Sequence, residues 1–365
     1  MKIGIITFHR AENFGAVLQC YALQTFLKSL GLDVEIIDYQ SKAICDVYRI
    51  VDFSVFKSDC SFWRKVHVFL GHLKTVFPRL EKKIQYIKFR NKYLNLSVYV
   101  KNINSLPTDV DCYIVGSDQM WNIALTGGID DVYFLNTKLN ATKITYAVSS
   151  ETWSYKMLES KSNDIKVLLN NFSNISVREA QFKAELEKYT ENPIEVCVDP
   201  SFLLNKDAYE KIISSPQNKG YILAYHLVDS QIMTSIAELV SRRNKKELIE
   251  IHAGFAKYKD RKRHKCNVGP AELLGYIANA DIVFTTSFHG LAFSLIFKKQ
   301  VWVIDNGGNS RQKNLLCQLG LQNRLIKSSD DILEDLQIDY SNVSIKIDSL
   351  VTDSIDFLKK SLKLH

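Results

Sequence analysis

The 365-residue sequence lacks the features that mark several common classes of protein. Its seven cysteines are odd in number, widely scattered and never in CxxC spacing, which argues against a disulfide framework or a zinc site. No apolar run reaches the roughly 18 residues that span a bilayer. The apolar run at residues 3–8 is too short for a signal peptide, and Lys2 stands alone before it. We therefore expect a cytoplasmic protein with reduced thiols.

Phosphate-binding motifs are also missing from the first βαβ unit that the sequence predicts. Apolar residues 3–8 and 34–39 predict two buried strands, and residues 16–30 predict an amphipathic helix that ends at Gly31. Neither G-x-G-x-x-G nor a P-loop is present, so a dinucleotide is disfavoured. Gly15 directly precedes a helix start, which favours anions, and we expect a ligand to approach the backbone there.

Acidic residues are scarce between residues 42 and 101, where basic and aromatic side chains are interleaved in a chain of net charge +7. We expect this segment to form helices inserted after the second strand. One interpretation is a solvated helical face over a local core. The other is a surface that makes peripheral contact with anionic lipid headgroups or receives an anionic lipid-linked substrate. Nucleic acid is disfavoured, because no nucleic-acid module is recognisable.

The alternation of strands and helices predicts two α/β domains. The pattern of the first domain starts again near residue 221, and the length of the chain favours two cores. We therefore predict two Rossmann-like domains that face a central cleft, a glycosyltransferase-B-like arrangement. The predicted domains are residues 1–199, with the insertion at about 42–101, and residues 200–345. Residues 346–365 are expected to form a C-terminal helix that packs back on the N-terminal domain.

Polar side chains follow several predicted strands at the sheet edge where open α/β sheets bind ligands. Each has a structural alternative: His289 could cap its own corner, Arg178 could pair with Glu179, and Arg311 could be solvated. Together they supply two guanidiniums, one imidazole and two helix starts, without a carboxylate cluster or zinc spacing for a metal. This combination suits a small, strongly anionic substrate that is handled without a metal.

The motifs at these corners resemble those of the polysaccharide pyruvyl transferase family. Residues 5–8, 13–19 and 21–24 resemble the opening of the family, and residues 115–122 and 176–179 resemble its next two motifs. Residues 287–290, 293–294 and 309–311 resemble its C-terminal signature. The resemblance implies transfer of a pyruvyl group from phosphoenolpyruvate onto two hydroxyls of a sugar. It implies no metal and no cofactor beyond this donor.

The resemblance also implies roles for single residues. His289 is the candidate for the general acid/base that the reaction needs, and Arg178 is placed beside it at the catalytic centre. The residues expected to bind the donor are Asn13, Gly15, Arg178, Ser287, His289, Gly290, Asn309, Ser310 and Arg311. The residues expected to bind the acceptor are Ser117, Asp118, Gln119 and Trp121. For Trp121 the sequence alone favours a core position over stacking on a sugar.

One residue departs from the pattern of the family. Many members carry Arg two positions before the histidine, where this chain has Ser287. Arg311 or Arg10 would then have to hold the donor.

The expected acceptor is a galactose- or mannose-type hexose in a lipid-linked precursor of a capsule or exopolysaccharide. The basic segment 42–101 motivates its placement at the inner face of the cytoplasmic membrane. Two alternatives remain open. A nucleotide-sugar-dependent glycosyltransferase of the same fold would need an acidic ribose ligand, for which Glu272 is available. A non-catalytic glycan-binding homologue would bind sugar but no donor.

Overall fold

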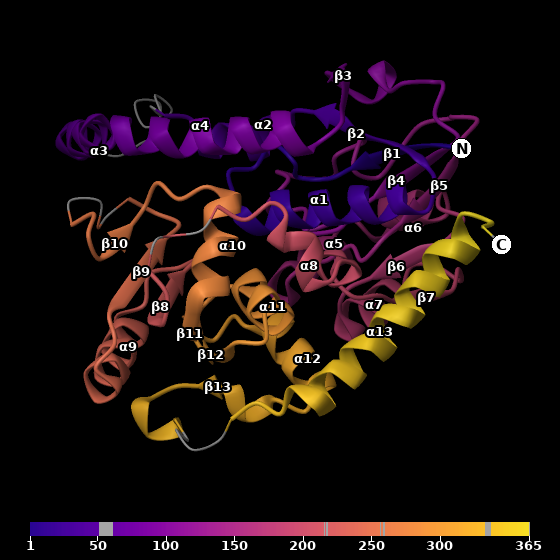
Figure 1. The fold of residues 1–365 in the computed structure, drawn as a ribbon. Coiled ribbons are helices and arrows are strands. Elements are labelled where there is room, and N and C mark those ends of the chain that lie inside the picture. The colour runs from indigo at the N-terminus through magenta and orange to yellow at the C-terminus, as the bar shows by residue number, and fades with distance from the viewer. Residues whose placement is uncertain are drawn as a thin grey trace.

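Two parallel sheets organise the chain, as the computed structural model in Figure 1 shows. The structure describes residues 1–50, 61–214, 216, 218–255, 257, 260–332 and 337–364. The strand order is β3-β2-β1-β4-β5 in the first sheet and β10-β9-β8-β11-β12-β13 in the second. The predicted fold class is confirmed: two Rossmann-like α/β domains form a glycosyltransferase-B-like arrangement.

The N-terminal sheet is centred on an apolar strand whose neighbours bury it on both sides. Ile3 is opposite Val34 on one neighbour and Cys112 on the other. A parallel bridge between Val148 and Val177 extends this sheet to a further pair of strands. The strands are β1 (Lys2–Ile6), β2 (Asp33–Tyr39), β3 (Leu96–Val100), β4 (Cys112–Val115), β5 (Thr142–Thr145), β6 (Ile175–Val177) and β7 (Ile194–Val196).

The helices of the N-terminal half include the predicted insertion. Gly31 follows the first helix at φ +79°, a left-handed conformation that glycine adopts without strain. Residues 51–60 of the predicted insertion lie outside the described residues. The helices are α1 (Phe14–Ser29), α2 (Lys42–Cys45), α3 (Phe62–Lys74), α4 (Val76–Tyr93), α5 (Tyr155–Glu159), α6 (Ser162–Leu169) and α7 (Ala180–Leu186).

Strand β3 corrects the prediction of an all-helical insertion. After α4 the backbone becomes extended at Leu94, and residues 96–100 pair in parallel with β2 at the edge of the sheet. Val98 and Tyr99 are exposed there, so this short strand lacks the continuous apolar run that marks a central strand.

The second sheet and the remaining helices form the C-terminal half. Its strands are β8 (Tyr221–His226), β9 (Leu248–His252), β10 (His264–Lys265), β11 (Ala280–Thr285), β12 (Gln300–Ile304) and β13 (Leu325–Ile326). Its helices are α8 (Lys206–Glu210), α9 (Gln231–Asn244), α10 (Pro270–Asn279), α11 (Phe288–Ile296), α12 (Ser310–Leu319) and α13 (Tyr340–Ser361). The predicted boundary between residues 199 and 200 lies in the connection between the two sheets.

The last helix returns to the first domain. Helix α13 begins at Tyr340, earlier than predicted, and runs along one side of the molecule toward the end of the N-terminal sheet (Figure 1). The hydroxyl of Ser354 accepts a hydrogen bond from the Val198 amide at 2.9 Å. Phe357 and Leu358 are buried in the same apolar cluster as Ile3 of β1.

Helix α1 joins the two halves of the molecule. Its residues Val17 and Leu18 share one apolar cluster with Leu291 of α11 and Leu274 of α10. The start of α1 therefore lies against the start of α11, where the carboxyl edges of the two sheets meet. Within the described residues, no helix combines the length and apolar character that a bilayer crossing requires.

Candidate active site

His289 lies directly on the backbone of Gly15, which belongs to the opposite domain. Helix α11 begins just before it, and the Ser287 hydroxyl caps that helix by accepting from the Gly290 amide at 3.3 Å. A Cβ atom placed on Gly15 would lie only 1.9 Å from Nδ1 of His289. Gly15 is therefore required by the close approach of an imidazole from the other domain, not by an unusual backbone angle.

A buried carboxylate, Asp199, lies between His289 and Arg178. Its Oδ2 is 3.4 Å from Nε2 of His289 and 3.0 Å from Nη2 of Arg178. Burial raises the pKa of Asp199, but the charges of Arg178 and His289 outweigh it, so this pKa lies well below its ordinary value. Asp199 is therefore ionised at neutral pH and can orient the imidazole.

Sequence reasoning missed Asp199, because the Asp199-Pro200 pair suggests only a domain boundary. The available signal was its position just after β7, at the same sheet edge as the other polar corners.

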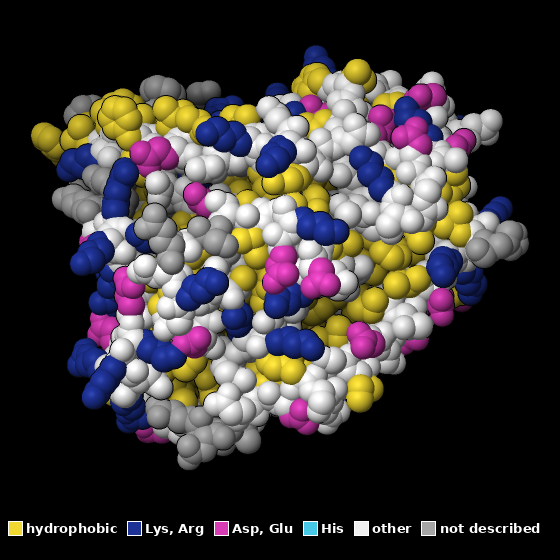
Figure 2. Space-filling view, in the orientation of Figure 1, with side chains coloured by type: hydrophobic (Ala, Val, Ile, Leu, Met, Phe, Trp, Pro, Cys, Tyr) yellow, Lys and Arg dark blue, Asp and Glu magenta, His cyan; other side chains and the backbone are white. Residues whose placement is uncertain are grey.

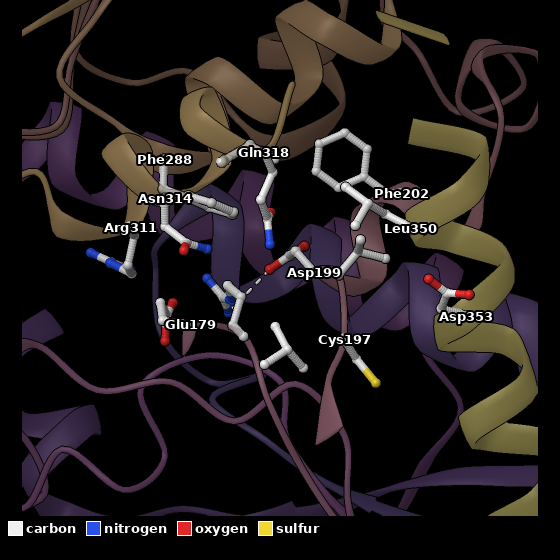
Figure 3. A pocket seen from close by; sticks show the side chains of 14 residues that line it. Glu179, Cys197, Asp199, Phe202, Phe288, Arg311, Asn314, Gln318, Leu350 and Asp353 are labelled. Atoms are coloured by element: carbon white, nitrogen blue, oxygen red, sulfur yellow. Dashed lines mark ion pairs between the residues drawn. The ribbon is translucent and has the colours of Figure 1, made fainter. Parts of the chain in front are cut away.

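Arg178 is buried beside Asp199 and does not face solvent. Its side chain is 3% exposed, its Nη2 donates to the Ser117 hydroxyl at 2.7 Å, and its guanidinium is 4.9 Å from the ring centroid of Phe288. Its Nε and Nη1 have no hydrogen-bond partner among the described residues. Arg178 borders a cavity of about 40 Å³, shown in Figure 3 with the ion pair to Asp199 as a dashed line. That volume can hold a water molecule but no substrate.

Arg311 is held by a second carboxylate that sequence reasoning missed. Its Nε donates to Glu151 at 2.8 Å, and the Ser310 hydroxyl donates to the other oxygen of the same carboxylate, also at 2.8 Å. Nη1 of Arg311 is 4.0 Å from Asp118. Glu151 follows β5 and a polar loop, so only its position after a strand could have indicated it.

A cavity of about 200 Å³ opens between the domains in front of His289. Three helices begin at or beside its wall: α1, α11 and α12. The unpaired amides and partial positive charge of helix N-termini favour an anion there. The predicted site residues that line this cavity are Asn13, Asp118, Gln119, Ser287, His289 and Arg311.

Several predicted donor residues have structural roles outside the wall of this cavity. Asn309 is buried, with its amide nitrogen donating to Ile304 O at 2.9 Å, and Ser310 is engaged by Glu151. A Cβ on Gly290 would lie 2.3 Å from the Thr285 hydroxyl, so Gly290 serves the packing of α11 on β11. Among the predicted donor residues, Arg178 also lies behind this wall.

The assignment of Trp121 to the acceptor is corrected. The ring is 1% exposed and stacks on Phe134 at 5.2 Å, and its Nε1 donates to Tyr133 O at 3.0 Å. Its ring and its polar atom are both engaged within the core. Ser117 is likewise fully buried, where it bonds Arg178.

Arg10, the other arginine considered for the donor, is engaged elsewhere. It makes two hydrogen bonds to Asp38, at 2.6 and 2.5 Å, and His9 contacts the same carboxylate at 3.0 Å. In the described part of the chain, Arg311 is the guanidinium that lines the cavity in front of His289.

Four carboxylates lie close to the two arginines, and among the described residues none of them belongs to a group spaced to hold a metal. Asp118, Glu151, Glu179 and Asp199 surround the two guanidiniums, so both cations already have anionic neighbours. Burial raises the pKa of Glu179 to about 7, although Arg178 and Arg311 act in the opposite direction. Its Oε1 accepts a hydrogen bond from Ser149 at 2.9 Å.

Groups with suitable spacing for a metal lie elsewhere, at the ends of β8 and β9. His226, Asp229 and His252 form one such group, and Glu250, His252 and His264 form another. Their atoms are engaged with one another and with Arg263, which donates to Glu250 at 2.6 Å. These residues do not line the cavity in front of His289. A metal-free reaction therefore remains a prediction.

The fold and the site define a glycosyltransferase-B-like α/β protein with an anion-favouring cavity between its domains. The model of one family, polysaccharide pyruvyl transferase, matches residues 13–308. This span covers most of the chain and includes Asn13, Ser287 and His289 of the cavity wall, whereas Arg311 lies just beyond it. The chain belongs to the polysaccharide pyruvyl transferase family.

Solved structures of similar overall fold are distant in sequence. UDP-GlcNAc 2-epimerase from Methanocaldococcus jannaschii is 13% identical, with a TM-score of 0.47 over 96% of this chain and 93% of that one. A putative UDP-N-acetylglucosamine 2-epimerase from Listeria monocytogenes is 10% identical, with a TM-score of 0.49 over 96% and 90%. The glycosyltransferase SsfS6 from Streptomyces sp. SF2575 is 10% identical, with a TM-score of 0.40 over 98% and 96%. Comparison with curated proteins gives no match.

Gly15→Ala should separate the domains at the site, because its methyl group cannot share space with the His289 ring. We expect a stability loss of about 1–3 kcal/mol, the usual cost of overpacking, and a loss of ligand-induced stabilisation. Urea unfolding with and without phosphoenolpyruvate measures both. Gly71→Ala is the control, because a Cβ there meets no neighbour within 4 Å. Equal unfolding free energies and equal stabilisation by phosphoenolpyruvate in the two variants would contradict the contact between Gly15 and His289.

Glu179→Gln should change the pH dependence of stability. Because the folded pKa of Glu179 is raised to about 7, its contribution to stability is full below pH 4.5 and is lost as pH rises through 7. The variant should therefore gain stability relative to the wild type between pH 5 and 8, by as much as roughly 3 kcal/mol. Unfolding free energies of the variant and the wild type at pH 5 and at pH 8 measure this gain. The exposed Glu191→Gln is the control. A difference independent of pH would show that Glu179 is ionised throughout.

Proposed function

We propose that the protein transfers the pyruvyl group of phosphoenolpyruvate onto two hydroxyls of a hexose, forming a cyclic ketal on a lipid-linked precursor of a surface polysaccharide. The observation that carries this proposal is the His289–Asp199 pair at an interdomain cavity bordered by three helix N-termini. Membership of the family supports the reaction class. The galactose or mannose type of the hexose remains an expectation.

The donor fits the charge distribution of the cavity. Phosphoenolpyruvate carries a phosphate and a carboxylate, and a guanidinium can bind either through two parallel hydrogen bonds. Arg311 lines the cavity, and α1 and α11 begin on its other walls, where the partial positive charge of a helix start favours an anion. Arg178 acts as a positioning residue, because it holds Asp199 against His289.

The reaction needs proton transfers that one imidazole can perform. Protonation of the donor methylene carbon gives a methyl group and an oxocarbenium-like centre at C2, to which the first hydroxyl adds as it loses its proton. The C–O bond to phosphate then breaks, and the second hydroxyl closes the ring. Of the two hydroxyl protons, one is matched by the new methyl C–H bond and the other by the departing hydrogen phosphate. His289, oriented by Asp199, is the group we assign to these transfers.

The glycosyltransferase alternative has less support at this site. Its candidate ribose ligand, Glu272, accepts a hydrogen bond from the Gly269 amide at 2.8 Å and caps α10. Glu272 does not line the cavity in front of His289.

His289→Asn should reduce phosphate release from phosphoenolpyruvate in the presence of acceptor by about 10²–10⁴-fold, the usual contribution of a positioned proton transfer. Asp199→Asn should act in the same direction, since the imidazole loses its ionised partner. The exposed Asp207→Asn serves as the control. Undiminished turnover in His289→Asn would remove the imidazole from the mechanism.

Thermal stabilisation by a nucleoside diphosphate but not by phosphoenolpyruvate would favour a glycosyltransferase. Sugar binding without donor binding would favour a non-catalytic homologue.

We also propose peripheral contact with an anionic membrane through α3 and α4. Exposed apolar side chains recur along these helices at alternating spacings of three and four residues, which in α4 places those at 77, 80, 84 and 87 on one face. Glu81 is the one acidic residue between residues 62 and 93. Figure 2 shows apolar side chains in yellow over this part of the molecule. The exposed residues of the stripe are Leu70, Leu73, Phe77, Leu80, Ile84 and Ile87.

Phe77→Ser combined with Leu80→Ser should weaken binding to vesicles that contain anionic phospholipid, because both exposed apolar side chains are removed. Co-sedimentation measures the bound fraction. Ile345→Ser, on the exposed side of α13, is the matched control. Equal binding of both variants, or equal binding to neutral vesicles, would argue against this membrane contact.

A further inference from the structure

A second cavity adjoins the one in front of His289. It has a volume of about 270 Å³ and lies between the two domains, beside the inserted helix α4. The two cavities share four lining residues: Asn13, Val47, Tyr48 and Leu227. The two cavities are therefore adjacent, and a ligand that reaches both must be longer than the three-carbon donor.

Two cations of α4 reach into the second cavity. Lys82 is 4% exposed, and its ammonium donates to Ala253 O at 3.0 Å. It lies 5.4 Å from the ring centroid of Phe14 and 5.5 Å from that of Phe255. The guanidinium of Arg79 lies over the same Phe255 ring at 4.9 Å. An ammonium has three N–H donors, and this one has a single carbonyl partner, so it can still donate hydrogen bonds to an anionic ligand.

The charge of this cavity is positive. Arg49, Arg79 and Lys82 line it, against one carboxylate, Glu12. Arg49 is paired with Asp46 at 2.7 Å, so Arg79 and Lys82 supply the unmatched positive charge. The carboxylate of Glu12 is 3.7 Å from the ammonium of Lys83. Lys83 also belongs to α4, and its positive charge offsets the negative charge of Glu12. Aromatic and aliphatic side chains form most of the remaining surface. An anion there would be partly shielded from water, and a charge pair is stronger in such surroundings than in water.

We propose that this second cavity binds the phosphate or diphosphate group that links the acceptor sugar to its carrier. The inference rests on the proposed function and names the class of its acceptor: a glycosyl phosphate ester rather than a free sugar. The sugar hydroxyls then extend past Tyr48 and Leu227 into the cavity in front of His289.

The donor cannot serve as the occupant of this second cavity during the reaction. Both of its anionic groups are attached to the carbon that must react near His289, so they stay in the first cavity. The position of α4 also favours the acceptor. One face of this helix carries the exposed apolar stripe, and Arg79 and Lys82 reach from the same helix toward the interior.

The ionisation of Lys82 gives a further observable. Burial lowers its pKa to about 8, with Arg79 acting in the same direction and Glu12 and Cys266 opposing. A bound phosphate requires the protonated ammonium. Affinity in the wild type should therefore fall above pH 8, and this fall should be absent in a variant without Lys82.

Calorimetric titration of the full chain with inorganic pyrophosphate tests the proposal directly. Arg79→Met and Lys82→Met should each weaken binding by about tenfold or more, because a charge-assisted contact is lost. Lys88→Met, an exposed position on α4, should have no effect. Lys82→Arg should restore binding, and cooperative urea unfolding of each variant confirms that it is folded.

Kinetics with four acceptors identify the carrier. The KM for a hexose 1-phosphate, a nucleoside-diphosphate hexose or a polyprenyl-diphosphate hexose should rise about tenfold in Lys82→Met, whereas the KM for the free hexose and for phosphoenolpyruvate should stay unchanged. The carrier with the lowest wild-type KM is the preferred source of the phosphate.

Two results would overturn the subsite: equal pyrophosphate affinity in the wild type, Arg79→Met and Lys82→Met, or binding that is lost in Arg311→Met instead. Failure of the proposed function is a different result. It would appear as no phosphate release with any acceptor, and the pyrophosphate titration would still decide whether the second cavity binds phosphate.

Discussion

The ionised carboxylate of Asp199 depends on two partners that come from different domains. A buried carboxylate is costly unless it is paired, and removal of one partner leaves that cost uncompensated. Arg178 belongs to the N-terminal domain and His289 to the C-terminal domain, so the pairing of Asp199 requires the two domains to stay in contact. Gly15 permits this contact because it has no side chain. Assembly of the site therefore depends on the same contact that holds the two domains together.

The same constraint explains how a negatively charged donor can bind among four carboxylates. Arg178 is already matched by Asp199, and Arg311 is shared between Glu151 and Asp118. The starts of α1, α11 and α12 add a fixed partial positive charge beside Arg311. The inserted helix α4 adds a separate source of positive charge in the adjoining cavity. This division places a small donor at the helix starts and leaves the cations of α4 to a longer ligand.

The fold was predictable because both sheets have buried, apolar central strands followed by polar corners. That pattern also placed His289, Asn13 and Arg311 at one edge, since the carboxyl ends of parallel strands must meet there. It could not show which side chains occupy the cavity wall. Asp199 and Glu151 bind partners 21–160 residues away in the chain, and such pairing leaves no local periodicity. Trp121 and β3 illustrate the same limit, because a buried aromatic ring and a short edge strand have ambiguous local patterns.

The central claim is that Asp199 and His289 act as one unit in proton transfer. A double-mutant cycle on phosphate release, with Asp199→Asn, His289→Gln and the double variant, measures their coupling directly. The account predicts that the double variant is no slower than His289→Gln alone, because Asp199 works through the imidazole. Rate losses that multiply across the two substitutions would show that the two residues act independently, and would contradict the account.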